Sequence, residues 1–100
     1  MDPTLTAAAG LFGVLSHPGR LQVLVLLTET ESLGTAELQA ATGLERTALS
    51  HQLRILREAH LLHVSREGRR RRYRLADHHV AHIVRDALAH VQEPPCPQSR

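Results

Sequence analysis

The spacing of apolar residues changes once along this chain, and that change limits the folds open to it. Over residues 44–60, apolar side chains recur at helical spacing. Residues 61–66 and 70–76 instead have the pattern of two strands joined by a turn at Gly68, and in the second strand Tyr73 and Leu75 alternate with Arg72 and Arg74. Alternation places successive side chains on opposite faces of a strand. The sequence therefore predicts a single hairpin in a chain that is otherwise helical.

Four other segments have the apolar spacing or the capping residues of helices, and their order defines an architecture. Helices are expected over residues 5–15, from Pro18 onward, over 35–43 and over 77–93. A very short strand is expected at Leu33. With the helix over 44–60 and the hairpin, the order is helix, helix, helix–turn–helix, hairpin, helix. We therefore predict a mainly α (α+β) winged helix–turn–helix fold, with about five helices and a β-hairpin wing.

The expected boundaries within this fold follow from capping residues and prolines. Thr35 and Asp77 are expected to cap the helices that follow them, and Gly43 to end the third helix. The single domain is expected to span 1–93. Prolines interrupt residues 94–100, which are expected to form a mobile tail. The fourth helix is expected to face inward through Leu49, Leu53 and Leu56.

Positive charge is concentrated in one third of the chain. Residues 45–75 contain nine arginines and three acidic residues, a net charge of +6, whereas the whole chain carries +2 and the remainder therefore −4. All twelve basic residues are arginine, which binds phosphate and guanine through two parallel hydrogen bonds. A local excess of this kind favours a polyanionic partner.

The helix–turn–helix and the hairpin together predict binding to double-stranded DNA. The second helix of such a motif enters the major groove with its N-terminal residues. A basic hairpin tip can contact phosphates or enter the minor groove. The candidate contacts are Arg46, Thr47, Ser50, His51 and Arg54 on the helix, and Arg69, Arg70, Arg71 and Arg72 at the hairpin tip.

Short motifs spread over the chain resemble one known family. They are LF at 11–12, LSHPGRL at 15–21, LSHQLRILR at 49–57, REGR at 66–69 and YRL at 73–75. Over about residues 11–93 the chain closely resembles the ArsR/SmtB repressors. The resemblance implies a homodimer held together by the first and last helices. It also implies repression of transcription by the metal-free protein.

Two histidines and two acidic residues form a candidate metal site at the ends of the last predicted helix. His79 and His90 are 11 residues apart, which returns them to within about 20° of one face but separates them by about 16 Å. Two such helices, antiparallel about a two-fold axis, would pair His79 with His90 and Asp77 with Glu93 around one crossing point near residue 85. Two imidazoles and two carboxylates suit a tetrahedral zinc ion. The geometry thus predicts two intersubunit sites.

The spacing Asp-x-His…His-x-x-Glu is similar to the last-helix sensing site of the zinc-responsive ArsR/SmtB members. This likeness implies the same four ligands here. Residues 35–41 contain no cysteine, which disfavours thiolate sites for arsenic, cadmium, lead or copper(I). Cobalt(II) would use the same ligands. Nickel(II) usually takes more donors, which His82 or a folded-back tail could supply; His78 and Cys96 are further candidates.

Each of these signals also has a purely structural interpretation. The arginines could form a solvated face, Asp77 could serve only as a helix cap, and His90 and Glu93 could be exposed polar residues. Three functions therefore remain open. The first is a repressor whose apo dimer binds a palindromic operator and is released by zinc, or by cobalt or nickel. The others are a winged-helix repressor without metal sensing, and a winged-helix module that docks on RNA or protein.

Other classes of protein find little support in the sequence. No nucleophile–base pair, phosphate loop or cofactor motif is present, so we expect no catalytic residues and no enzyme. Cys96 is the single cysteine, which excludes an intramolecular disulfide. No apolar run has membrane-spanning length, and the N-terminus lacks the pattern of a signal peptide. We expect a cytoplasmic protein with no membrane partner.

Overall fold

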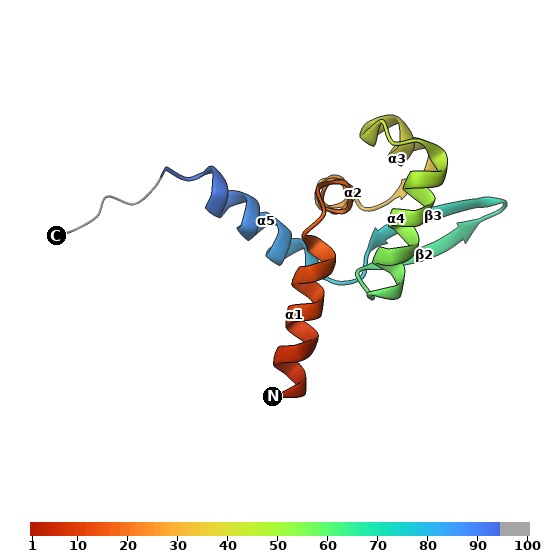
Figure 1. Ribbon diagram of the computed structural model, residues 1–100. Helices are drawn as coiled ribbons and strands as arrows, with labels where there is room; N and C mark the ends of the chain where they lie inside the picture. Colours follow the sequence, from red (N-terminus) through yellow and green to blue (C-terminus); the bar gives the residue numbers. More distant parts are fainter. Residues whose placement is uncertain (95–100) are drawn as a thin grey trace.

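The computed structural model describes residues 1–94 and confirms the predicted winged helix–turn–helix architecture (Figure 1). The expected mobility of the tail and the candidate ligand Cys96 fall on residues outside this range. The described part of the chain forms the helices α1 (Pro3–Leu15), α2 (Pro18–Thr28), α3 (Thr35–Thr42), α4 (Arg46–Glu58) and α5 (His78–Gln92), and the strands β1 (Leu33–Gly34), β2 (Leu62–Glu67) and β3 (Arg70–Leu75).

Side chains just before several helices accept hydrogen bonds from the free backbone amides of the first helical turn. Asp2 Oδ1 accepts a hydrogen bond from the Thr4 amide at 2.7 Å, so α1 begins two residues before the predicted start. His17 caps α2 in the same way. Asp77 caps α5 as predicted, because its Oδ1 accepts from the Val80 amide at 3.1 Å. These caps fix where the helices begin.

The predicted cap of α3 is wrong by one residue. Thr35 lies inside the helix, and Gly34 is the capping residue. Glycine has no side chain that could accept a hydrogen bond from the helix. Instead, a side chain in the first turn of the helix accepts a hydrogen bond from the backbone of the capping residue. Glu37 Oε1 accepts from the Gly34 amide at 2.8 Å, which is the reciprocal half of a capping box.

The three strands form one antiparallel sheet in the order β1-β3-β2. In the wing, β2 and β3 pair without interruption from Leu62 opposite Leu75 out to the tip. Gly68 makes the tip turn with a φ of 64°, in the left-handed region that favours glycine. Leu33 of β1 lies opposite Tyr73 of β3. Because β1 runs directly into α3, this pairing attaches the base of the wing to the helix–turn–helix.

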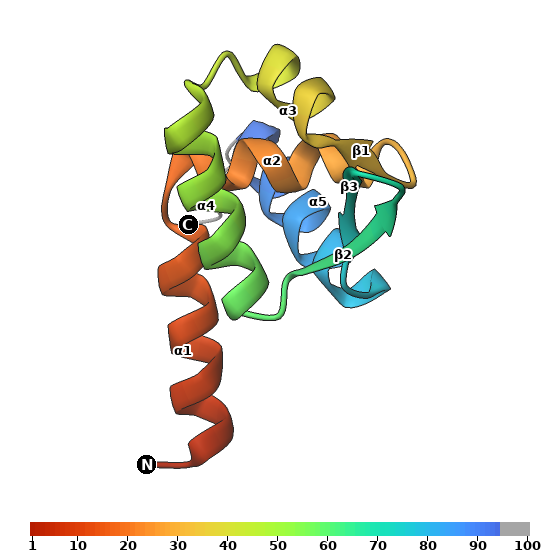
Figure 2. The same cartoon turned by 90° about the vertical axis from the view of Figure 1, so that its right-hand side faces the viewer.

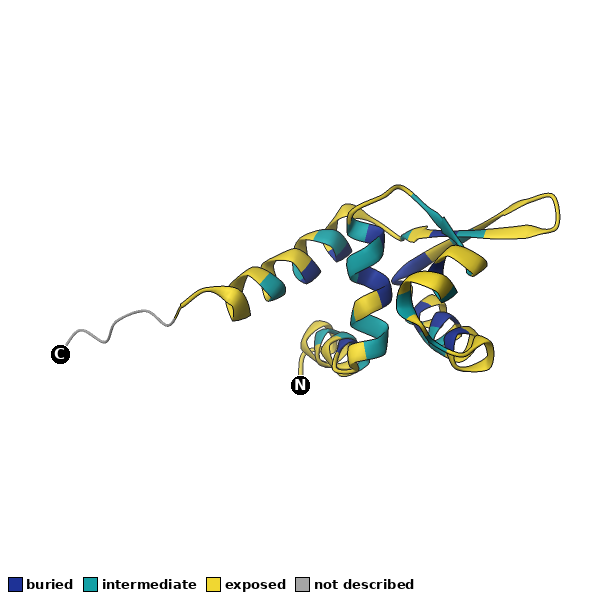
Figure 3. Cartoon of the chain, turned by 90° about the horizontal axis from the view of Figure 1, so that it is seen from above, coloured by how far each residue is buried: buried dark blue, intermediate teal, exposed yellow. Residues whose placement is uncertain are grey.

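The hydrophobic core lies between α2, α4, the sheet and the first half of α5 (Figure 3). The predicted inward stripe of α4 is confirmed, since Leu49, Leu53 and Leu56 are all buried. α2 contributes Val23 and Leu24, both completely buried. This core packs α4 against the sheet from which the wing extends.

Two helices leave apolar surface uncovered within the chain. In α1 only Leu15 is buried, although the helix is rich in alanine and leucine. Leu5 and Phe12 of α1 are each 59% exposed, and Val91 at the end of α5 is 74% exposed. Figure 1 shows α5 and the wing projecting on opposite sides of the core. An apolar helix with one buried residue is typical of a surface that another subunit covers.

Within residues 1–94, no single helix has the length and apolar character to cross a membrane. α1 and α2 meet those requirements only when taken together, and the chain bends by 95° between them.

Candidate functional site

The segment from α3 to α4 has the form of a helix–turn–helix. Gly43 ends α3 in the left-handed conformation with a φ of 70°, as predicted. Glu45 then caps α4 with its carboxylate, so α4 begins at Arg46 and not at residue 44. The helix also ends two residues before the predicted end, because His60 takes a left-handed φ of 61°.

α4 separates an inward apolar face from an outward polar face. The leucine stripe packs into the core, Gln52 and Ile55 beside it are half-buried, and the other residues between the leucines are exposed. In Figure 2, α4 lies on the outside of the helical core beside α2. The five side chains predicted to contact DNA from this helix are all exposed: Arg46, Thr47, Ser50, His51 and Arg54.

Two concave surfaces join α4 to the wing. In the first, Thr47, His51 and Arg54 of α4 face Arg71 and Tyr73 of β3. The second lies between the N-termini of α3 and α4 and the hairpin, and it is lined by residues that include Glu37, Arg46, Ser50, Glu67, Arg69, Arg70, Arg71 and Arg72. Ser50 borders both. The outer face of α4 and the wing therefore form one continuous basic surface.

The four wing arginines are not equivalent. Arg69, Arg70 and Arg71 are exposed on the part of the hairpin that extends beyond the core, as Figure 3 shows for the tip. Arg72 is half-buried, with 29% of its side chain exposed. Its Nη1 donates to Glu37 Oε1 at 2.8 Å, and its Nη2 donates to the Ser32 carbonyl at 3.1 Å. The structure thus turns Arg72 toward β1 and α3.

Glu37 connects α3 to the base of the wing. The amide of Gly34 holds the pKa of the Glu37 carboxyl below its ordinary value of 4.5, and the guanidinium of Arg72 acts in the same direction, while partial loss of water opposes them. One carboxylate oxygen accepts from both partners. The ionised form of Glu37 is therefore the form that this local structure stabilises.

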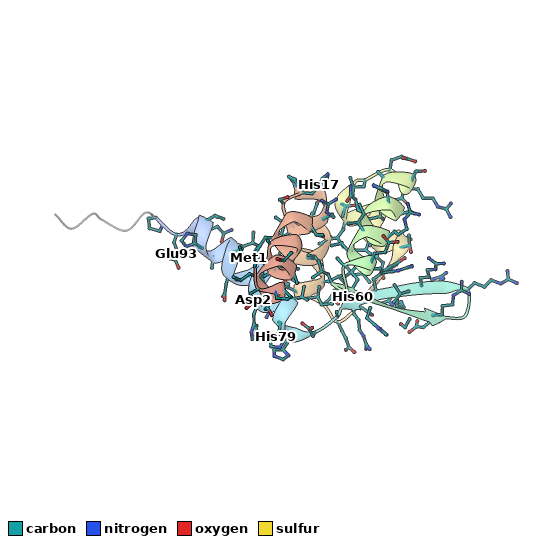
Figure 4. The ribbon with its side chains drawn as sticks, turned by 60° about the horizontal axis from the view of Figure 1, so that its bottom comes forward. Met1, Asp2, His17, His60, His79 and Glu93 are labelled. Atoms are coloured by element: carbon teal, nitrogen blue, oxygen red, sulfur yellow. The ribbon has the colours of Figure 1, made fainter. Side chains whose placement is uncertain are left out.

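The four predicted metal ligands lie at the two ends of α5. Asp77 and His79 are at its N-terminus, and His90 and Glu93 are in and after its last turn. Figure 4 shows His79 near the body of the protein and Glu93 at the far end of the helix. Within residues 1–94, no three His, Cys, Asp or Glu side chains gather closely enough to hold a metal ion. One chain therefore does not bring the four residues together.

The individual side chains are nevertheless suited to bind an ion. Among residues 1–94, Asp77 accepts a hydrogen bond only at Oδ1, in the helix cap, which leaves its second oxygen for an ion. His79, His90 and Glu93 are exposed, as a ligand that reaches toward another subunit must be. Imidazole nitrogens and carboxylate oxygens are common ligands of zinc.

Three histidines cluster at the start of α5. The ring centres of His78 and His79 are 4.1 Å apart, and those of His78 and His82 are 5.5 Å apart in an edge-to-face arrangement. All three side chains are exposed. Of the two spare histidines named from the sequence, His78 thus lies next to the predicted ligand His79, and His82 lies next to His78.

Sequence reasoning missed two residues that connect functional elements. Glu37 could have been found, because a capping acid three residues after Gly34 is a local pattern. Arg20 of α2 could not. Its Nε donates to the Val14 carbonyl near the end of α1 at 2.7 Å, and its Nη1 donates to Gln52 of α4 at 3.0 Å. Gln52 is 32 residues from Arg20 and Val14 only six, and no local pattern predicts either contact.

Comparison with known proteins gives a consistent result. Residues 17–64 match the family described as "Bacterial regulatory protein, arsR family". The chain is 41% identical over 85 residues to a transcriptional repressor SmtB homologue of Synechocystis sp., covering 85% of this chain and 64% of that protein. It is 39% identical over 82 residues to the transcriptional regulator NmtR of Mycobacterium tuberculosis, covering 82% of this chain and 68% of that regulator.

The fold also matches a solved structure of known assembly. This is the homodimeric winged helix–turn–helix DNA-binding domain of a protein from Mycobacterium bovis, determined in solution by NMR. The TM-score is 0.76 at 33% identity, with 88% of this chain and 79% of the other covered. Sequence and structure comparisons thus agree on the type of protein. Because the chain spans less than two thirds of the SmtB homologue, the comparison covers only part of that repressor.

Proposed function

The chain belongs to the ArsR family of bacterial regulatory proteins, and on that premise we propose that it is a metal-responsive transcriptional repressor. In this proposal, the metal-free homodimer binds a palindromic DNA operator. Zinc, or cobalt or nickel in its place, binds at two intersubunit sites and releases the DNA. Membership of a family of regulators confirms the expectation that the chain is not an enzyme. A regulator of this kind acts where the chromosome lies, in the cytoplasm.

DNA binding is supported above all by the continuous basic surface formed by α4 and the wing. The exposed N-terminal half of α4 carries donors and small side chains suited to base edges. The two grooves join this half of the helix to the wing arginines. A duplex whose major groove receives α4 would therefore meet the wing at its phosphates or minor groove.

Dimerisation is supported by the uncovered apolar surface of α1 and α5. Phe12 and Leu5 on α1 and Val91 on α5 are more than half exposed, although all three are large apolar side chains. Burying them against a second copy would remove this surface from water. The related domain from Mycobacterium bovis is a homodimer with the same fold.

Metal binding is supported by the donor set on α5 and by its arrangement. Asp77 and His79 of one protomer, with His90 and Glu93 of the partner subunit, would surround one ion if the two α5 helices pack antiparallel. Zinc would supply a bond between protomers that the apolar contacts alone do not provide. An ion held from both sides restricts how the two α5 helices move, and hence how far apart the two α4 helices lie.

Regulation would then follow from the spacing of the two α4 helices in the dimer. A dimer binds two half-sites about one DNA turn apart. An effector that favours a dimer with a different spacing weakens operator binding by its preference for that dimer. Such couplings typically change affinity by about 5- to 150-fold.

The test is a binding measurement with and without metal. The purified protein selects duplexes from a random DNA pool, and fluorescence anisotropy then gives its affinity for the selected duplex. We expect a palindromic sequence, an affinity that falls steeply with salt, and weaker binding when zinc, cobalt or nickel is added. Tight operator binding that no metal alters would support a repressor without metal sensing. Failure to select any duplex would leave the RNA or protein docking module as the explanation.

A further inference from the structure

Arg72 differs from the other wing arginines because its guanidinium faces the body of the protein. Nε and Nη2 donate to Ser32 Oγ at 3.3 and 3.0 Å, and Nη2 also donates to the Ser32 carbonyl at 3.1 Å. Nη1 donates to Glu37 Oε1 at 2.8 Å. All three guanidinium nitrogens are therefore engaged within the chain. A side chain bound in this way has little capacity left for a phosphate.

The partners of Arg72 belong to the segment that begins the helix–turn–helix. Ser32 precedes β1, Gly34 lies opposite Arg72 in the β1–β3 pairing, and Glu37 is in the first turn of α3. Glu37 Oε1 accepts from both the Gly34 amide and Arg72 Nη1, each at 2.8 Å. We call Ser32, Gly34, Glu37 and Arg72 the wing clasp. It joins the base of the wing to the N-terminus of α3.

We propose that the wing clasp is a positioning element, in which Arg72 sets the angle of the wing to α4 and does not itself contact DNA. The inference rests on the DNA-binding function proposed above. A two-stranded hairpin has little stability of its own, so the direction of its tip depends on how its base is held. A base fixed in advance lets the tip arginines and α4 reach one duplex without ordering the hairpin at the moment of binding.

Two acidic residues in the same groove allow a test, because the proposal predicts opposite changes in DNA affinity when each is replaced. Glu37 and Glu67 both line the groove between α3, α4 and the wing, but only Glu37 belongs to the clasp. If these acids acted only through charge, removing either would strengthen binding to DNA. We expect Glu67→Ala to strengthen binding and Glu37→Ala to weaken it by about two- to fivefold, the range of an exposed ion pair. Stronger binding by both variants would overturn the proposal.

The dependence of affinity on salt distinguishes positioning from phosphate contact. Each phosphate contact contributes about 0.9 to the slope of log affinity against log salt. Arg71→Ala is expected to weaken binding and reduce the slope by about that amount. Arg72→Ala is expected to weaken binding with the slope unchanged. Ser32→Ala changes no charge and should weaken binding in the same direction. An equal loss of slope in Arg71→Ala and Arg72→Ala would assign Arg72 to a phosphate.

A measurement without DNA tests the clasp separately from the proposed function. In Glu37→Ala, hydrogen exchange by NMR should be faster for amides in the β1–β3 pairing, and unchanged for those at the wing tip. If the wild-type protein bound no duplex, the proposed function would fail, and the exchange data alone would decide whether the clasp holds the wing. Unchanged exchange at β1 and β3 in Glu37→Ala would overturn the clasp, whatever the DNA results.

Discussion

Glu37 has two structural roles that both depend on its ionised carboxylate. It closes the N-terminus of α3 by accepting from the Gly34 amide, and it forms an ion pair with Arg72. Because the same oxygen serves both partners, protonation weakens both contacts at once. A change at this one residue therefore weakens both the N-terminus of α3 and the attachment of the wing.

The stability of the fold should consequently depend on pH through Glu37. The Gly34 amide and Arg72 hold its pKa lower in the folded chain than in the unfolded chain. Ionised Glu37 therefore stabilises the fold above its ordinary pKa of 4.5, and this contribution is lost as pH falls through the lowered value. Urea unfolding at a series of pH values from about 6 downward should show a flatter acid dependence in Glu37→Gln than in the wild type. Parallel curves would contradict this expectation.

Ser50 and His51 are expected to contribute to the choice of DNA sequence. Both are exposed in the N-terminal half of α4, and Ser50 borders both grooves. Ser50→Ala or His51→Ala should lower affinity for the selected operator by about 1–3 kcal/mol, and affinity for an unrelated duplex much less. The measurement is anisotropy on both duplexes at one salt concentration. Equal losses on the two duplexes would place these side chains at the backbone.

At the scale of elements, the wing is a sheet extension with a basic tip. Replacing Arg69 and Arg71 together with alanine should weaken binding to every duplex alike, because these residues are expected to meet phosphate. The salt slope should fall by about 1.8, which corresponds to two contacts. Circular dichroism would show that the variant remains folded. An unchanged affinity and slope would mean that the hairpin does not touch DNA.

The elements themselves could be predicted because their signals are local. The leucine spacing of α4, the alternation in β3 and the turn at Gly68 lie within short stretches, and the structure confirms all three. The boundaries were less accurate. The α3 cap at Gly34 and the end of α4 at Glu58, two residues before His60, depend on backbone conformation, which residue type alone does not determine.

The residues of the candidate site could be predicted from the sequence, but the orientation of each side chain could not. The sequence identifies a basic hairpin tip, yet four consecutive arginines give no sign that one of them turns inward. Arg72 does so because β1 pairs with β3 and brings Ser32 and Glu37 beside it, 40 and 35 residues earlier in the chain. Contacts between such distant segments exist only once the sheet has formed.

At the scale of the whole molecule, the metal sites can be tested by mixing two variants. His79→Ala and His90→Ala homodimers should each bind no zinc tightly. In a heterodimer of one with the other, both losses fall on the same intersubunit site. The other site keeps His79 from one subunit and His90 from the other, so the heterodimer should bind one zinc ion tightly. Isothermal titration of a tagged, purified heterodimer measures this number.

The same experiment separates two ways of building the site. If each site were formed within one chain, both subunits of the heterodimer would carry a defect, and it would bind no zinc tightly. A matched control combines His79→Ala with wild type, which should also retain one site. Zero tight zinc in the first heterodimer and one in the control would contradict the antiparallel intersubunit arrangement.

The separation of the candidate ligands along α5 has a consequence for how such a protein would respond in a cell. A site whose halves lie about 16 Å apart on one helix is completed only by association with a second copy. Occupancy would then obey mass action in two variables, the concentration of the ion and the concentration of the protein itself. Binding of the ion would raise the affinity of the two protomers for each other, and dimerisation would raise the affinity of the protein for the ion. The threshold of the response would therefore shift with the expression level of the protein.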